Sequence, residues 1–167
     1  MPEYHDPDLR LFCDEMLHRL GRWLRAAGYD TVIAEPGSDD HDIAARAAVD
    51  NRWLVTRDRH LARFRDLREG VILLGENDVP ALAAELTARL PIDWLARPLS
   101  RCLECNTLLV DARPDQVETL PPGALSVTDR VRYCPGCGRL YWEGSHTRRM
   151  RHTLENFARG EWTVATD

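Results

Sequence analysis

Four short apolar runs alternate with amphipathic segments over the first ninety residues, and this alternation restricts the fold more than any other feature. The apolar runs occupy residues 9–13, 31–34, 53–56 and 71–74. Apolar residues at helical spacing follow each run, over residues 16–27, 39–50, 58–67 and 79–90. Such a β-α alternation with short connections predicts an α/β fold, a small parallel sheet with helices on both faces.

The connections after these runs exclude two common classes of nucleotide-binding protein. No glycine-rich loop follows a predicted strand, whereas dinucleotide-binding folds and P-loop NTPases both need one to bring backbone N–H groups close to phosphate. In open α/β sheets ligands bind outside the carboxyl ends of the strands. A ligand site on this sheet is therefore expected to use side chains at that edge.

Acidic residues occur where the chain reaches this edge. Asp14 and Glu15 follow the first run, Asp58 follows the third, and Asp40 lies at the start of a predicted helix. Asp78, after the fourth run, is a further candidate. Carboxylate oxygens suit Mg²⁺ and Mn²⁺, and a bound cation offsets the repulsion within an acidic cluster. The alternative role is structural, because acids are ordinary N-caps and first-turn residues of helices.

Two cysteine pairs indicate a second metal site in the C-terminal part of the chain. Cys102/Cys105 and Cys134/Cys137 form two C-x2-C pairs, and four thiolates make a closed tetrahedral Zn²⁺ site of the structural kind. Four unrelated thiols and a rubredoxin-like iron site are the alternatives. Six prolines punctuate the stretch from 91 to 135, which predicts a sheet domain over residues 1–96, then a zinc ribbon with a C-terminal helix over 97–167.

Composition bounds the partners and the compartment. All 22 basic residues are arginines, and the net charge of −5 gives no general basic surface for nucleic acid. No apolar run approaches the 18 residues of a membrane-spanning helix, and the first residues lack the pattern of a signal peptide. We therefore expect a cytoplasmic protein with no membrane contact.

Several short motifs occur in an order that is typical of one known family. They are Phe12-Cys13-Asp14-Glu15-Met16-Leu17, Leu20-Gly21-Arg22-Trp23-Leu24-Arg25, Gly28-Tyr29-Asp30, Leu54-Val55-Thr56-Arg57-Asp58, both cysteine pairs, and Tyr141-Trp142-Glu143-Gly144-Ser145-His146. From about Leu11 to Met150 the chain resembles the Mut-seven C-terminal RNase family, a branch of the PIN-like nucleases fused to a zinc ribbon.

The resemblance implies a PIN-like sheet and RNA cleavage that depends on Mg²⁺ or Mn²⁺. Carried onto this chain, the metal-binding catalytic acids are Asp14, Asp40 and Asp58, with Glu15 beside them. Two departures bear on the site: a fourth acid late in the sheet domain is represented only by Asp78, and the second acid is an aspartate near a helix start.

The C-terminal helix carries the candidates for RNA binding. Arg148, Arg149 and Arg151 are predicted to contact phosphate, because an acidic protein must concentrate its positive charge locally, and His146 is a further candidate. A solvated helix face is the alternative. Tyr141 and Trp142 suit either base stacking or packing of the ribbon against the sheet, and for Trp142 packing is the favoured role.

These observations predict a metal-dependent ribonuclease with RNA as its partner. Two other hypotheses stay open. One is a non-catalytic adaptor that binds RNA or protein through the ribbon. The other is a toxin-like ribonuclease controlled by an antitoxin partner. A protein partner or a homo-oligomer is compatible with each.

Overall fold

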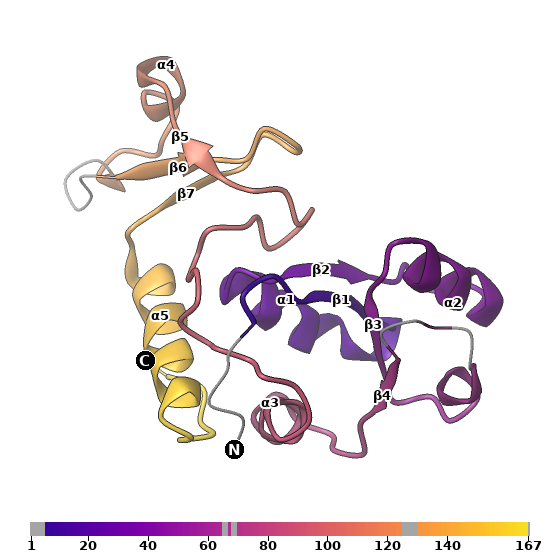
Figure 1. The fold of residues 1–167 in the computed structure, drawn as a ribbon. Helices are drawn as coiled ribbons and strands as arrows, with labels where there is room; N and C mark the ends of the chain where they lie inside the picture. The colour runs from indigo at the N-terminus through magenta and orange to yellow at the C-terminus, as the bar shows by residue number, and fades with distance from the viewer. Residues whose placement is uncertain (1–5, 65–66, 68–69, 125–129, 167) are drawn as a thin grey trace.

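The computed structural model describes residues 6–64, 67, 70–124 and 130–166, and it contains the predicted parallel sheet (Figure 1). All neighbouring strands of this sheet are parallel, in the order β2-β1-β3-β4. The strands are β1 (Arg10–Cys13), β2 (Asp30–Ile33), β3 (Trp53–Thr56) and β4 (Val71–Leu73). The α/β prediction is confirmed, and the central positions of β1 and β3 put Asp14 and Asp58 at the middle of the carboxyl edge.

Helices cover both faces of the sheet because successive side chains of the central strands point to opposite sides. In β1, Leu11 and Cys13 join the core under α1 and α3, whereas Phe12 joins the core under α2. All three side chains are fully buried, so the strand is apolar throughout rather than alternating. The helices are η1 (Glu15–Leu17), α1 (His18–Ala26), α2 (Asp40–Val49) and α3 (Val79–Thr87).

The helix predicted over residues 58–67 is wrong over 58–64, where the chain forms a turn and the short 3-10 helix η2 (Leu61–Arg63). The Asp58 carboxylate accepts a hydrogen bond from the His60 N–H at 2.6 Å, which stabilises a turn directly after β3. Residues 65–66 lie outside the described part of the chain. Asp58 is therefore held in a turn and not in the first turn of an α-helix.

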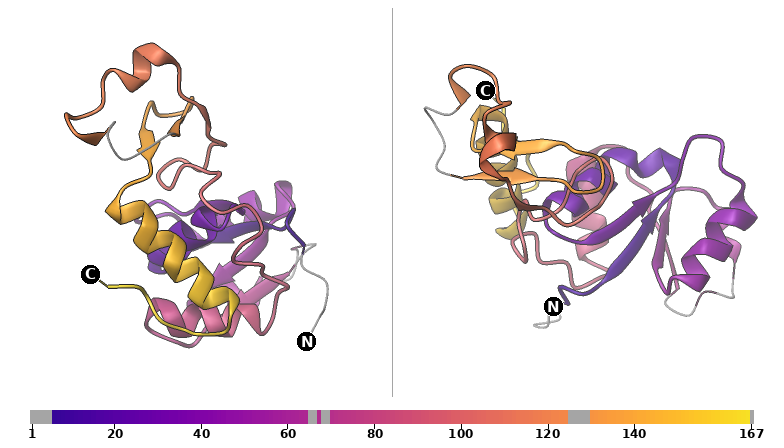
Figure 2. Two further views of the ribbon diagram at one scale, coloured as in Figure 1. Left: turned by 90° about the vertical axis from the view of Figure 1, so that its left-hand side faces the viewer. Right: turned by 90° about the horizontal axis from the view of Figure 1, so that it is seen from above.

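The cysteine-bearing part contains a small antiparallel sheet, in the order β5-β6-β7. Its elements are β5 (Val110–Asp111), the short helix α4 (Pro114–Val117), β6 (Val131–Tyr133) and β7 (Leu140–Trp142). Figure 2 shows this sheet standing to one side of the parallel sheet, joined to it by an extended stretch and by the long helix α5 (Ser145–Ala158). The architecture agrees with the predicted ribbon followed by a C-terminal helix.

Helix α5 packs on the parallel-sheet unit and completes its core. Leu154 is fully buried among residues of α1 and α3. The Phe157 ring lies 5.1 Å from Trp94 and 6.1 Å from Trp23, both in edge-to-face orientation. Residues on either side of the predicted boundary near residue 97 thus share one apolar core.

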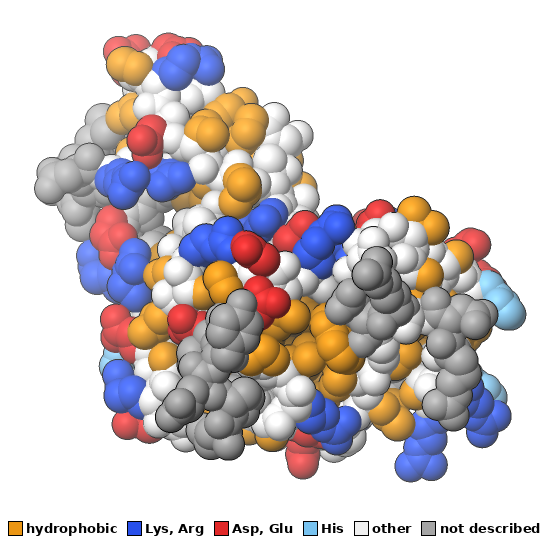
Figure 3. Space-filling view, viewed as in Figure 1, with side chains coloured by type: hydrophobic (Ala, Val, Ile, Leu, Met, Phe, Trp, Pro, Cys, Tyr) orange, Lys and Arg blue, Asp and Glu red, His pale blue; other side chains and the backbone are white. Residues whose placement is uncertain are grey.

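Polar contacts fix the first cysteine pair to the same unit. The buried Arg25 guanidinium of α1 donates to the carbonyls of Leu103 and Glu104, each at 2.8 Å. The Asn106 side chain donates to Asp30 at 2.7 Å and accepts from the Thr31 N–H at 3.0 Å. In Figure 3 basic and acidic side chains lie next to one another along this junction. In the described residues, no helix has the length and apolar character that crossing a membrane requires.

Candidate active site and metal centre

Asp14 lies at the carboxyl end of β1 and is almost completely buried, with 2 % of its surface exposed. Its Oδ1 accepts the Leu17 N–H at 3.1 Å and so caps η1, and its Oδ2 accepts the Arg57 N–H at 2.9 Å and the Thr56 hydroxyl. A carboxylate offers about four acceptor positions. Three are taken, so Asp14 retains one, on Oδ1.

Thr56 connects this carboxylate to the next strand. Its hydroxyl, fully buried at the end of β3, donates to Asp14 and accepts the Asp58 N–H at 2.8 Å. The two acids at the ends of the central strands are therefore held by one continuous chain of hydrogen bonds. Sequence reasoning missed Thr56; the available signal was a hydroxyl residue closing an apolar strand two positions before an acid.

The remaining predicted acids approach from the two helices that begin at this edge. Asp40 opens α2 and is half-buried, and its carboxylate makes no hydrogen bond or ion pair with the described residues. Glu15 opens η1, and its Oε2 accepts the Gly37 N–H at 2.6 Å across the β2–α2 loop. We use the name acidic edge for Asp14, Glu15, Asp40 and Asp58.

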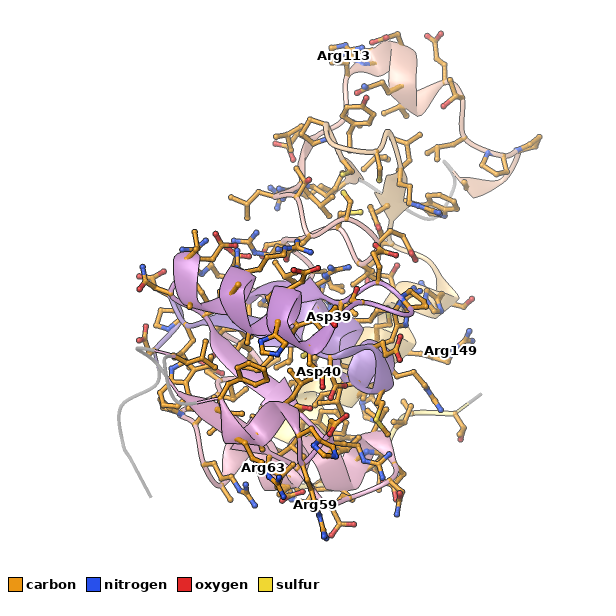
Figure 4. The ribbon with its side chains drawn as sticks, turned by 90° about the vertical axis from the view of Figure 1, so that its right-hand side faces the viewer. Asp39, Asp40, Arg59, Arg63, Arg113 and Arg149 are labelled. Carbon is orange, nitrogen blue, oxygen red and sulfur yellow. The ribbon has the colours of Figure 1, made fainter. Side chains whose placement is uncertain are left out.

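The structural alternative applies to part of this set. Asp39 caps α2 through the His41 N–H at 2.8 Å, and Asp78 caps α3 through the Ala81 N–H at 2.9 Å. Asp14 also caps a helix, although its second oxygen does not take part in the cap. Figure 4 shows Asp39 and Asp40 side by side at the start of α2.

The acidic edge offers the oxygen ligands that a hard divalent cation requires. One Oδ1 position of Asp14, both oxygens of Asp40 and one oxygen of Asp58 are free of hydrogen bonds from described residues. In the described part of the chain, the four cysteines form the one group whose ligand atoms all approach within 4.8 Å. Among the described residues, the acids of the acidic edge do not form such a group.

Arginines border the acidic edge at the ends of β3 and β4. Arg57, Arg59 and Arg89 line a cavity of about 410 Å³ together with Glu85. The Arg57 side chain donates to Asn77, and its backbone N–H holds Asp14, so the cavity adjoins the buried acid. Figure 4 shows Arg59 and Arg63 on the side of the molecule that also carries Asp40.

The cations predicted from sequence to bind RNA lie elsewhere. Arg148, Arg149, Arg151 and His146 belong to α5, which stands at the opposite end of the parallel-sheet unit from α2 (Figure 1). Arg151 forms an ion pair with Glu143 at 3.7 Å. The structure therefore does not bring these four residues to the acidic edge.

The four cysteines converge as the C-x2-C spacing predicts. The Sγ atoms of Cys102 and Cys137 are 3.6 Å apart, those of Cys105 and Cys134 are 3.3 Å apart, and all four lie within 4.8 Å of one another. Zinc bound at about 2.3 Å from each sulfur in a tetrahedron needs sulfur–sulfur spacings of about 3.8 Å. The cluster fits a single such ion.

The two cysteine pairs have the same local backbone structure. Asn106 donates its N–H to the Cys102 carbonyl at 3.0 Å, and Gly138 donates to Cys134 at 2.8 Å. Asn106 and Gly138 occupy equivalent positions with positive φ, 69° and 77°. Glycine and asparagine are the residues that tolerate this conformation best, which explains the small residue after each pair.

Two polar side chains, the half-buried Tyr141 and the buried Arg25, join the cysteine cluster to its surroundings. The Tyr141 hydroxyl lies 3.1 Å from Cys102 Sγ and accepts the Leu103 N–H at 3.2 Å; burial and the Cys102 contact raise its pKa, so the hydroxyl stays neutral. Burial lowers the pKa of the Arg25 guanidinium, and nearby anionic groups oppose the shift. The Arg25 guanidinium donates its hydrogen bonds to backbone carbonyls, so Arg25 is a structural residue.

These features define a class: an α/β protein with acids at the carboxyl edge of a small parallel sheet, joined to a four-cysteine metal-binding ribbon. The family model described as the Mut7-C RNAse domain matches residues 9–154. The chain belongs to this family, which suggests a ribonuclease-type function and RNA binding. Comparison with curated proteins and with solved structures yields no match.

Proposed function

We propose that this protein is a metal-dependent ribonuclease that hydrolyses RNA phosphodiester bonds at the acidic edge. The observation that carries the proposal is the hydrogen-bonded chain from Asp58 through Thr56 to Asp14. It fixes the Asp14 carboxylate and the Asp58 backbone at the ends of the central strands, which is the position where open α/β sheets bind their ligands. The family match supports RNA as the substrate.

In this proposal Asp14, Asp40 and Asp58 hold Mg²⁺ or Mn²⁺, and Glu15 lies at the margin of the site. The bound cation would supply an activated water and stabilise charge on the phosphate. Thr56 keeps Asp14 and Asp58 in register, and Arg57 and Arg59 offer guanidinium groups to the neighbouring phosphates of the strand. The cysteine cluster holds zinc in a structural role, because it is a closed site of four thiolates.

Asp40 provides the sharpest test, because its carboxylate makes no contact that the fold requires. Asp40→Asn removes one negative charge and keeps the shape of the side chain. We expect the free energy of unfolding to stay within about 0.5 kcal/mol of the wild-type value, as for surface substitutions. Mn²⁺-dependent cleavage of single-stranded RNA should be lost. Asp14→Asn should also abolish cleavage. Its amide group would face the Arg57 N–H, so this variant should have a lower free energy of unfolding than wild type.

Asp39→Asn is the matched control. Asp39 is the neighbour of Asp40, and asparagine is as good an N-cap as aspartate, so this variant should keep both stability and cleavage. Equal cleavage by wild type and Asp40→Asn, with equal metal dependence, would refute the proposal.

A non-catalytic RNA-binding adaptor is the second candidate, and one observation favours it. Both oxygens of Asp14 already accept hydrogen bonds within the protein, as expected of an acid with a structural role. The adaptor predicts RNA binding that needs no Mg²⁺ or Mn²⁺ and survives Asp40→Asn, with no cleavage by wild type under any metal condition.

A further inference from the structure

A cavity of about 440 Å³ lies where the ribbon, α1 and α5 meet, at a distance from the acidic edge. A smaller one of about 150 Å³ shares Arg22, Leu103, His146 and Met150 with it and is also lined by Arg19 and Trp23, so the two are adjacent. Ligand sites typically measure about 300–1,000 Å³ and occur at the interfaces between structural units. We use the name ribbon cleft for the space lined by Arg22, Leu103, Arg139, Tyr141, Trp142 and His146.

The walls of the ribbon cleft combine aromatic rings with positive charge. Tyr141 and Trp142 from β7 are half-buried, and the Tyr141 ring is held by its hydroxyl contacts at Leu103 and Cys102. The Trp142 indole N–H makes no hydrogen bond with the described residues. A ring fixed in advance loses little conformational freedom when a ligand stacks on it.

The charge of the cleft is opposite to that of the protein. Arg22, Arg101 and Arg139 line the larger cavity, and Glu104 is the one acidic residue of the described chain that also lines it. Glu104 pairs with Arg22 at 2.9 Å, and three arginines against one carboxylate leave a charge of +2 in a chain whose net charge is −5. An anion that also carries a flat aromatic group fits these walls, and this is the chemistry of a nucleotide.

Helix α1 connects the cleft to the acidic edge. Glu15 and Arg19 are exposed and Arg22 is half-exposed, and these three residues follow at helical spacing. Glu15 lies in η1 and Arg22 in α1, and with the rises of the two helix types the seven residues between them span roughly 12 Å. A few nucleotides of a single strand can cover this path.

We propose that the ribbon cleft binds one unpaired nucleotide of an RNA strand whose continuation lies across α1 to the acidic edge. The base stacks on Trp142 and Tyr141, and Arg139 and Arg22 contact the adjoining phosphates. This inference rests on the proposed function, since it names the part of the substrate that the ribbon holds. It also assigns Trp142 and His146 to a ligand-binding surface.

The test is binding of a short fluorescein-labelled single-stranded RNA to the zinc-loaded full chain, with Mg²⁺ and Mn²⁺ omitted so that no cleavage occurs. Trp142→Leu keeps apolar bulk but removes the stacking surface, and we expect binding to weaken about 5- to 150-fold. Arg139→Gln should lower the slope of log affinity against log salt by about 0.7, the value for one phosphate contact on a single strand.

Matched controls separate the cleft from the rest of the surface. Trp162→Leu changes a half-buried tryptophan that contacts Phe157, and Arg113→Gln changes an exposed arginine at the far end of the ribbon (Figure 4). Both should bind RNA as wild type does. Binding of the same RNA as a duplex, of a strand made abasic throughout, and of a free mononucleotide shows whether an unpaired base within a strand is required.

Wild-type affinity in both Trp142→Leu and Arg139→Gln would overturn the inference, as would equal affinity for the abasic strand. If Trp142→Leu proves unfolded by zinc content or unfolding temperature, Arg139→Gln on the exposed surface still decides, together with photo-crosslinking of 4-thiouridine RNA to wild type. Crosslinks confined to peptides outside Leu140–Met150 count against the cleft. If these variants lose RNA binding and no form of the protein cleaves RNA, the ribbon cleft is supported and the proposed nuclease activity is refuted. If cleavage requires Asp40 and the cleft variants bind and cleave RNA as wild type does, the nuclease activity is supported and the ribbon cleft is refuted.

Discussion

Replacing Thr56 with valine tests whether the hydrogen-bonded chain at the ends of β1 and β3 organises the acidic edge. Valine has nearly the shape of threonine, so Thr56→Val leaves no cavity at this fully buried position. It removes one donor to Asp14 Oδ2 and the acceptor for the Asp58 N–H. The Arg57 N–H then remains the one donor to that oxygen among those the structure describes.

The magnitude follows from the kind of hydrogen bond that is lost. A bond to a charged group contributes about 1.5–3 kcal/mol, and the Asp58 N–H is partly accessible, so water can replace its acceptor. We expect the free energy of unfolding to fall by about 2–3 kcal/mol. For a chain of this size that corresponds to a decrease of about 4–12 °C in unfolding temperature. Release of Asp58 from Asp14 should lower the cleavage rate about 10²-fold, the usual effect of a displacement near 1 Å.

The assay is urea unfolding with Mn²⁺-dependent cleavage measured on the same samples. Thr56→Ser restores the hydroxyl and should recover most of both properties. Thr31→Val is the matched control, because Thr31 is also fully buried in the sheet, but its hydroxyl donates to the Tyr29 carbonyl. It should lose stability and keep the cleavage rate. Wild-type stability and cleavage in Thr56→Val would show that the chain of hydrogen bonds organises nothing.

Three further predictions concern stability. Removing zinc with a chelator should lower the unfolding temperature of the whole chain in one transition, because the first cysteine pair is bonded to α1; separate transitions by circular dichroism would contradict this. Burial raises the pKa of Asp30, but hydrogen bonds from Arg52 and Asn106 outweigh it and lower the pKa to about 2. Asp30 thus stabilises the fold above pH 4 and loses this contribution as the pH falls towards 2, so the stability difference from Asp30→Asn should shrink over that range. Phe157→Ala should cost about 3–5 kcal/mol in denaturant unfolding, whereas Leu108→Ala at an exposed ribbon position should cost less than about 0.5.

The parallel sheet could be predicted because its strands are short and buried on both faces. Leu11, Phe12 and Cys13 belong to two different cores, so the run is continuously apolar, and the helices between such runs leave a parallel order as the compact solution. The cysteine cluster was predictable for a similar reason. The C-x2-C spacing needs a small residue in the left-handed region after each pair, and Asn106 and Gly138 supply it.

Other features depend on contacts that no local pattern encodes. Leu61, Phe64 and Leu67 occur at helical spacing, yet the Asp58 side chain stabilises a turn that local spacing does not reveal. The apolar stripe of α5 shows that one face is buried but not which partner covers it, and α1 and α3 prove to be the partners. The role of Thr56 depends on a neighbouring strand more than forty residues away.

The helix starts explain how several carboxylates can lie together at the acidic edge of the folded chain. Both η1 and α2 begin at this edge, because each follows a strand of the parallel sheet and returns over a face. Helix N-termini carry a partial positive charge, which stabilises carboxylates in the first turn. Asp14 and Asp39 act as caps and accept hydrogen bonds from the free N–H groups at the helix starts. Asp40 lies in the first turn of α2, the helix that Asp39 caps, so the positive end of the helix stabilises its carboxylate while its oxygens accept no hydrogen bond from the described residues. Capping and metal binding are therefore compatible here: the caps hold the backbone, and the acid next to a cap keeps its oxygens free for a ligand.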